Sequence, residues 1–156
     1  MSPSERGFVN QTSSHHSLMP YWQLFYHIVW STKNRESLLT PEIEPRVYAL
    51  IQSKAQHLAA TVYALNGMTD HVHLIVSIPP KVAVATFIGQ IKGVASTRLN
   101  QSHGGVHRFA WQDEYGVFSF DKKHLPHHVA YVERQKEHHA QGTIIPLLER
   151  TGDPAI

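Results

Sequence analysis

Two histidines separated by a single residue are the first feature of this sequence that suggests chemistry. His71 and His73 begin the run of residues 71–78, whose aliphatic and β-branched residues predict a strand. Because side chains alternate along a strand, both imidazoles project from one face, about 7 Å apart. Two imidazoles at that spacing can converge on one cation. On an exposed sheet face, however, the same pair can be two solvated polar residues, so the motif alone does not decide.

A tyrosine and a glutamine four residues apart form the second candidate group. Tyr131 and Gln135 lie in residues 125–141, where a proline at the start and a glycine after the end predict a helix. At this spacing the phenol and the amide project from one helical face, with His127 and His138 above and below them. A nucleophile and an oxygen ligand would then lie together. Taken alone, the helix also allows Tyr131 to be a packing residue and Gln135 a surface residue.

The elements that must position these groups follow from periodicity and turn signals. In order, they are a strand over 21–31, a helix over 41–60 capped by Thr40, an antiparallel pair over 61–68 and 71–78, a helix over 84–99, a short hairpin of 109–111 with 117–120, and the helix over 125–141. This order predicts an α+β fold of the ferredoxin-like or RRM-like kind, an antiparallel sheet with helices on one face. The other face is then free for a ligand.

Length and composition limit the organisation of the chain. Its 156 residues fit one domain, which we place at residues 20–142, between a flexible extension over 1–19 and a C-terminal tail over 143–156 whose segment 144–150 either docks or frays. A net charge of +2 does not support a strong general attraction for polyanions. No apolar stretch approaches the ~20 residues that span a membrane. We therefore expect a soluble, cytoplasmic protein without a membrane partner.

Five segments, taken in this order, resemble one family. They are residues 27–35, 70–76, 91–93, 111–112 with 115–119, and 131–139. Over about residues 21–141 the chain resembles the HUH (histidine, hydrophobe, histidine) transposases with one catalytic tyrosine, the IS200-like transposases of bacterial insertion sequences. The resemblance implies the HUH endonuclease fold.

The resemblance also implies roles for the candidate residues. In the family, two histidines hold Mg²⁺ or Mn²⁺, the tyrosine attacks DNA, and the glutamine four residues later completes the metal shell. These roles fall on His71, His73, Tyr131 and Gln135. A phenol of pKa about 10 is barely ionised at neutral pH, so its attack needs charge neutralisation on the phosphate, which a divalent cation supplies. The implied reaction is cleavage and rejoining of single-stranded DNA at insertion-sequence ends through a 5′-phosphotyrosine.

Partners follow from the same resemblance. Excision of an element requires two tyrosines, so a homodimer acting on DNA with hairpin ends is expected. Gly105 or the connection 121–126 would allow the tyrosine helix to serve either its own subunit or the other, and the sequence does not distinguish the two.

Contacts to DNA are assigned by residue type. The candidates for phosphates are Lys33, Arg35, Lys92, Arg98, Lys122 and Lys123, with Lys92 and Arg98 preferred, and those for stacking on bases are Trp111, Tyr115 and Phe118. Core packing or ordinary solvation is an equal alternative for each.

Three other functions remain open at this point. One is a non-catalytic module that binds single-stranded nucleic acid, although the aromatic motif of RRM domains is missing. Another is a two-histidine phosphoesterase, although no second histidine motif is present. The third is an HUH replication initiator or a domesticated HUH nuclease acting on repeated hairpins.

Overall fold

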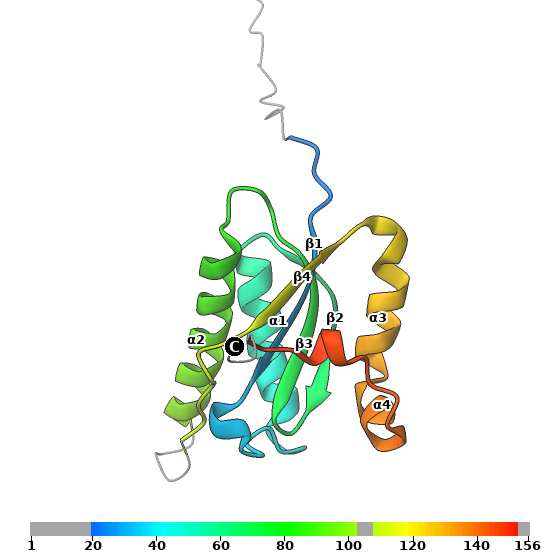
Figure 1. Ribbon diagram of the computed structural model, residues 1–156. Helices are drawn as coiled ribbons and strands as arrows, with labels where there is room; N and C mark the ends of the chain where they lie inside the picture. Colours follow the sequence, from blue (N-terminus) through cyan, green and yellow to red (C-terminus); the bar gives the residue numbers. More distant parts are fainter. Residues whose placement is uncertain (1–19, 103–107, 153–156) are drawn as a thin grey trace, which may run out of the picture.

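A four-stranded antiparallel sheet organises the chain, with strand order β2-β3-β1-β4. The computed structural model describes residues 20–102 and 108–152, so the predicted extension over 1–19 and Gly105 lie outside the described residues. The elements are β1 (Phe25–Ser31), η1 (Lys33–Arg35), α1 (Glu44–His57), β2 (Thr61–Met68), β3 (His71–Ser77), α2 (Val84–Ser102), β4 (Gly116–Phe120), η2 (Lys122–His124), α3 (Leu125–Glu133), α4 (Gln135–Gln141) and η3 (Pro146–Glu149), as Figure 1 shows. The predicted ferredoxin-like order is confirmed.

Helices α1 and α2 cover one face of the sheet and form the main core with it. Alternate residues of β3, namely Val72, Leu74 and Val76, are fully buried against these helices. They meet residues that recur at helical spacing, such as Ile51 in α1 and Ile91 in α2. This is the half of the fold that the sequence pattern describes well.

The sequence led us to expect that the opposite face of the sheet is free, but this face is covered. Helix α3 packs across β2 and β3 on that side, and α4 and η3 follow it (Figure 1). Tyr131 and Val132 bury a small apolar cluster there with Ala64 and Ile75. Ala64 and Ile75 occupy alternate strand positions that point to this face, so an open face would expose their apolar side chains to water. Helix α3 covers them and removes that area from water.

The ends of two elements differ from prediction. Strand β1 begins at Phe25 rather than at residue 21, because its partner β3 ends opposite Phe25, at Ser77, and two prolines follow at 79–80. Helix α1 begins after a turn at 41–43, so that Pro45 rather than Pro41 occupies its first turn.

The predicted hairpin of 109–111 with 117–120 is wrong. Strand β4 pairs with β1 instead, and Trp111 makes only an isolated bridge with Thr32. The side chain of Asn100 bonds both the N–H and the carbonyl of Phe109, at 2.8 Å each, which satisfies that backbone without a partner strand.

The predicted helix over 125–141 is divided at Arg134, whose φ and ψ are −101° and 21°. At this break the side-chain amide of Asn66 donates to the carbonyl of Glu133 at 3.0 Å. A side chain that takes a helix carbonyl interrupts the hydrogen-bond ladder. The break leaves Tyr131 near the end of α3 and Gln135 at the start of α4.

Candidate active site

Strand β3 and helices α3 and α4 bring the four predicted site residues together on the second face of the sheet. The ring centroids of His71 and His73 lie 5.1 Å apart, and that of Tyr131 lies 5.9 Å from His73. Oε1 of Gln135 is 3.3 Å from Nε2 of His71. All four side chains are buried and belong to one chain, so this structure assembles them within a single subunit.

A carboxylate that the sequence did not predict lies among them. Glu149, in η3, places Oε2 3.2 Å from Nε2 of His71 and 2.8 Å from Nε2 of His73. Its Oε1 accepts hydrogen bonds from the hydroxyl of Tyr131 and from Nε2 of Gln135, the latter at 3.2 Å. No motif or spacing marks Glu149, and the domain boundary that we placed at residue 142 leaves it in the tail.

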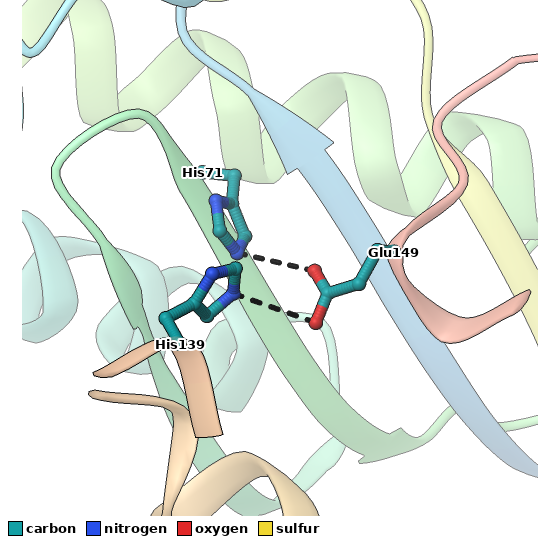
Figure 2. Close-up of side chains that lie close together, drawn as sticks. All are labelled: His71, His139 and Glu149. Atoms are coloured by element: carbon teal, nitrogen blue, oxygen red, sulfur yellow. Dashed lines mark ion pairs between the residues drawn. The ribbon is translucent and has the colours of Figure 1, made fainter. Parts of the chain in front are cut away.

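A third imidazole completes the cluster. His139 lies one helical turn after Gln135, and its Nε2 is 3.1 Å from Oε1 of that glutamine and 3.6 Å from Oε1 of Glu149. Figure 2 shows His71 and His139 facing the two oxygens of Glu149. The i, i+4 rule that pairs Tyr131 with Gln135 also reaches His139, so the sequence did carry a signal for it.

The spacing of these atoms fits a divalent cation. Ligand atoms of His71, His139 and Glu149 lie within 4.8 Å of one another, and the Gln135 oxygen lies between the two imidazoles. Ligands at ~2.1 Å from an octahedral ion are themselves ~3 Å apart, close to the separations here. Imidazole nitrogens beside amide and carboxylate oxygens suit Mn²⁺, and the oxygens suit Mg²⁺.

The charges of the site are unequally distributed. Burial alone would raise the pKa of Glu149, but hydrogen bonds with His71 and His73 outweigh it and hold that pKa well below its ordinary value. Burial raises the pKa of Tyr131 to about 12, and its hydrogen bond to Glu149 contributes in the same direction. The site therefore holds an ionised carboxylate against an un-ionised phenol.

Each histidine of the pair has a different partner behind it. Nδ1 of His71 is 2.7 Å from Oδ1 of Asp70, and these contacts with Asp70 and Glu149 raise the pKa of His71 although burial opposes them. Nδ1 of His73 is 2.8 Å from Nε2 of His27, and burial lowers the pKa of His73. Burial, with the neighbouring imidazoles, also lowers the pKa of His27 to about 2.

The two histidines predicted beside Tyr131 have different positions. His138 stacks on the Tyr131 ring, with centroids 4.9 Å apart and planes at 28°. His127 is exposed and lies beside His124 instead. Its neighbour His128 turns toward the site, where its Nδ1 is 2.9 Å from Nδ1 of His27. His127 and His128 precede Tyr131 by four and three residues, so helical spacing allows either of them on the Tyr131 face, and the prediction chose the wrong one.

The basic residues expected at DNA lie mostly away from this cluster. Lys92 is half-buried, and its ammonium donates to the carbonyls of Gln112 at 2.5 Å and Asp113 at 3.3 Å. It lines a groove of about 890 Å³ between α2 and the segment 108–115. Arg98, Lys122 and Lys123 are exposed.

The short helix η1 links that groove to the histidines. The backbone N–H of Lys33 donates to the carbonyl of Ala110 at 3.0 Å, beside the groove. Arg35, two residues later, lies 3.7 Å from Asp70, the partner of His71. Asn34 and Arg35 both have positive φ (55° and 53°), a conformation that asparagine tolerates and arginine seldom adopts.

The aromatic residues proposed for base stacking are partly used in packing. Trp111 donates from its indole N–H to the carbonyl of Lys92 at 3.0 Å and packs edge-to-face on Trp30 and Phe109. Tyr115 packs against the same core, and Phe118 lies 6.5 Å from the His27 ring. Packing therefore accounts for Trp111 best.

Comparisons with known proteins identify the family of this chain and several relatives. Residues 20–135 match the family described as "Transposase IS200 like". The chain is 28% identical over 90 residues to the ISDra2 transposase TnpA of Deinococcus radiodurans, across 58% of this chain and 64% of that protein. It is 29% identical over 85 residues to the transposase for insertion sequence element IS200 of Salmonella typhimurium, across 54% and 56%. The matched stretch thus spans less than two thirds of either relative.

Two solved structures have a similar fold. A Deinococcus radiodurans protein described as a candidate transposase superposes with a TM-score of 0.61 at 20% identity, covering 80% of this chain and 93% of that one. A REP-associated tyrosine transposase bound to a REP hairpin gives 0.59 at 17%, covering 80% and 73%.

The sheet, the histidine pair and the helical tyrosine together define a protein of the single-tyrosine HUH class. Within that class, the chain belongs to the IS200-like transposase family. None of the helices within residues 20–102 and 108–152 has both the length and the hydrophobicity that crossing a bilayer demands.

Proposed function

We propose that this protein is a DNA transposase that cleaves and rejoins single-stranded DNA at insertion-sequence ends, with Tyr131 as the nucleophile. One observation carries the proposal: the Tyr131 hydroxyl and the imidazoles of His71 and His73 contact the same carboxylate, Glu149. A phenol is thereby held beside atoms that fit a divalent cation. Membership in the IS200-like family gives this arrangement its substrate class.

The phenol is held in a fixed orientation. His138 stacks on its ring, and the backbone N–H of Ile145 donates to its oxygen at 3.0 Å. A nucleophile held near its attack position avoids part of the entropic cost of the reaction. Because the pKa of Tyr131 is raised, its proton must leave during attack, and the carboxylate of Glu149 is the acceptor already in contact with it.

His71, His73 and Gln135 are the residues that we assign to Mg²⁺ or Mn²⁺, and His139 lies within reach as a further donor. When bound, the cation neutralises charge on the scissile phosphate and stabilises the departing 3′ oxygen. The residues of the chain keep its ligands in place: Asp70 orients His71, and the helical turn from Gln135 to His139 holds their side chains together.

Glu149 occupies the position that a phosphate needs in order to contact Tyr131 and the histidines together. Two anions cannot share that position without strong repulsion. We therefore expect DNA to displace Oε2 of Glu149 from His71 and His73 as it binds, while Oε1 stays beside the Tyr131 hydroxyl as its proton acceptor. Displacement is feasible because η3 is a single short turn outside the sheet.

The substrate and assembly follow by family likeness and by chemistry. We propose single-stranded DNA with hairpin ends, since one solved structure of similar fold is a tyrosine transposase bound to a REP hairpin. Attack by Tyr131 forms a bond from its oxygen to phosphorus and releases a 3′ hydroxyl, leaving a 5′-phosphotyrosine. Another 3′ hydroxyl can attack this ester and restore the phosphodiester without ATP. Joining two ends needs two tyrosines, hence a homodimer.

The experiment uses single-stranded DNA from the flanks of the protein's own gene, labelled at either its 3′ or its 5′ end, with Mn²⁺. We expect a denaturation-resistant protein–DNA adduct that carries the 3′ label and not the 5′ label, because the protein is joined to the 5′ phosphate. Tyr131→Phe should abolish it, whereas Tyr63→Phe, an exposed tyrosine of β2, should not. Hydrolysed fragments without an adduct, or an adduct that persists in Tyr131→Phe, would refute the proposal.

A further inference from the structure

Three imidazoles form a continuous hydrogen-bonded chain that starts at the candidate metal ligand His73. Nδ1 of His73 is 2.8 Å from Nε2 of His27, and Nδ1 of His27 is 2.9 Å from Nδ1 of His128. His27 and His73 have no exposed surface. The ring of His128 is stacked on Phe120, with centroids 3.9 Å apart and planes at 9°. All three rings are therefore held in place, and His27 lies between the other two.

Proton counting gives this chain a direction. A neutral imidazole donates from one nitrogen and accepts at the other. Nε2 of His27 faces His73 and its Nδ1 faces His128. If Nε2 accepts from His73, Nδ1 must donate to His128, and if Nε2 donates, Nδ1 must accept. The proton position on any one ring therefore fixes the positions on the other two.

The present structure shows one of the two directions. Oε2 of Glu149 can only accept, so Nε2 of His73 carries the proton in their 2.8 Å contact. Nδ1 of His73 then accepts from Nε2 of His27, whose Nδ1 accepts from His128. A metal ligand must instead offer the lone pair of Nε2, which requires the proton on Nδ1. His27 must then accept where it now donates.

We propose that His27, backed by His128, is a positioning residue that sets the tautomer of His73 and so allows its Nε2 to bind the metal ion. The change balances: Nε2 of His73 releases its proton to water, and Nδ1 of His73 gains one from Nε2 of His27. His27 gains one at Nδ1 from His128, and His128 gains one at Nε2 from water. This inference rests on the proposed function only in assigning His73 as a ligand.

His71 shows why an imidazole is needed at this place. Its Nδ1 faces Asp70, a carboxylate that only accepts, so the proton of that nitrogen is fixed in every state. Among the residues that the structure describes, the contact of Nδ1 of His73 is not a carboxylate but the His27 ring. That ring can donate beside Glu149 and accept beside a metal ion. The two histidines of the motif are thus oriented by different partners, a carboxylate for His71 and an imidazole for His73.

Four variants test the proposal on the full-length protein. His27→Phe keeps an aromatic ring and removes both nitrogens. His27→Gln places an amide where Nε2 lies and can still accept from His73, whereas the shorter side chain of His27→Asn does not reach it. His127→Ala changes the exposed neighbour of His128 and serves as the control. Circular dichroism and thermal melting check that each variant folds.

The first measurement is affinity for Mn²⁺ alone, without DNA. We expect His27→Phe and His27→Asn to weaken it by roughly 10- to 100-fold, the usual effect of losing a partner behind a metal ligand. His27→Gln should restore most of the affinity and His127→Ala should leave it unchanged. Unchanged affinity in His27→Phe, or equal affinities in His27→Gln and His27→Asn, would overturn the proposal.

The second measurement is the tautomer of His73, read from its ¹⁵N resonances in protein labelled at histidine. We expect the proton on Nε2 in metal-free protein and on Nδ1 after saturation with Mg²⁺, in both wild type and Tyr131→Phe. A proton that stays on Nε2 in the saturated protein would overturn the inference. Because neither readout involves cleavage, failure here is distinguishable from failure of Tyr131 to form a DNA adduct.

Discussion

The two faces of one strand, β3, are buried in opposite ways. Val72, Leu74 and Val76 point into an apolar core shared with α1 and α2, where contacts have no preferred direction. His71 and His73 point the other way and are buried just as deeply, at 3% and 0% exposure. Burial of a polar group is costly unless it is hydrogen-bonded, so the second face needs partners at specified positions.

The chain meets that requirement with segments from its C-terminal third. Tyr131, Gln135, His139 and Glu149 all come from beyond β4 and surround the two imidazoles. Within residues 20–102 and 108–152, the buried side-chain atoms without a hydrogen-bond partner are Nε1 of Trp30 and the hydroxyl of Tyr48, both on the apolar side. One face of β3 therefore contributes stability by packing, while the other holds polar groups in the geometry that chemistry needs.

The largest expected effect concerns the apolar face. Leu74→Ala removes a fully buried side chain from the core, and we expect the free energy of unfolding to fall by about 2–5 kcal/mol. Urea denaturation measures it. Adduct formation per folded molecule should stay within twofold of wild type, because Leu74 points away from the site. A large loss of activity in the folded variant would mean that the two faces are coupled.

The adjacent residue should give the opposite result. His73→Ala removes a candidate ligand, and we expect the rate of adduct formation to fall at least about 100-fold, more than the loss of a residue behind a ligand causes. Its free energy of unfolding should fall by less than that of Leu74→Ala, since fewer apolar atoms leave the interior. Single-turnover kinetics with Mn²⁺ measure the rate. If His73→Ala lowered stability more than Leu74→Ala, and Leu74→Ala lowered the rate of adduct formation more than His73→Ala, the two faces would not divide stability and chemistry in this way.

The sequence predicted the apolar face and part of the other. Alternation in residues 71–78 and helical spacing in 84–99 are local patterns, and with the other local signals they predicted the pairing of β2 with β3 and both covering helices. His71, His73, Tyr131 and Gln135 were found because each pair is close in sequence. Their meeting across the sheet followed from a family resemblance rather than from periodicity.

What the sequence did not predict depends on contacts between distant segments. Glu149 reaches the site from a segment with no pattern of its own, and it lies 76 residues from His73. The pairing of β4 with β1 was missed because nothing local distinguishes it from a hairpin with 109–111. The sequence pattern predicted His27 only as another residue of a buried strand, although its ring faces the site. Alternation shows which face a residue takes, but it does not identify what covers that face.

The third prediction concerns the carboxylate on the chemical face. Glu149→Gln keeps the shape of the side chain and removes the charge that competes with phosphate, so we expect affinity for single-stranded DNA to rise on the order of tenfold. Fluorescence anisotropy in Mg²⁺ with Tyr131→Phe in both proteins excludes cleavage from the measurement. Weaker binding in Glu149→Gln would instead make the carboxylate a required ligand.

A second variant displaces the same segment without touching its charge. A Cβ added at Gly116 would lie 1.9 Å from the carbonyl oxygen of Arg150, so Gly116→Ala forces the backbone next to Glu149 to move. We expect DNA affinity to rise as in Glu149→Gln, by a smaller factor. If affinity rises in Glu149→Gln and not in Gly116→Ala, the charge of Glu149 limits binding and the position of its segment does not.

The smallest expected effects distinguish the roles of Arg98 and Lys92, the two basic residues preferred for contacts with DNA. Arg98 is exposed on α2, and Arg98→Ala should weaken binding of single-stranded DNA a few-fold and reduce the slope of log K against log salt by about 0.7, as expected for one lost phosphate contact. Lys92 already donates to the carbonyls of Gln112 and Asp113. Lys92→Ala should therefore lower the free energy of unfolding by about 1 kcal/mol, the usual contribution of such a bond. Salt titrations by anisotropy, together with urea denaturation, measure both. If Lys92 anchors the loop, its loss changes stability, whereas loss of an arginine that contacts phosphate changes the salt dependence of DNA binding. A reduced slope of log K against log salt in Lys92→Ala, at unchanged stability, would show instead that the Lys92 ammonium leaves the loop to contact DNA.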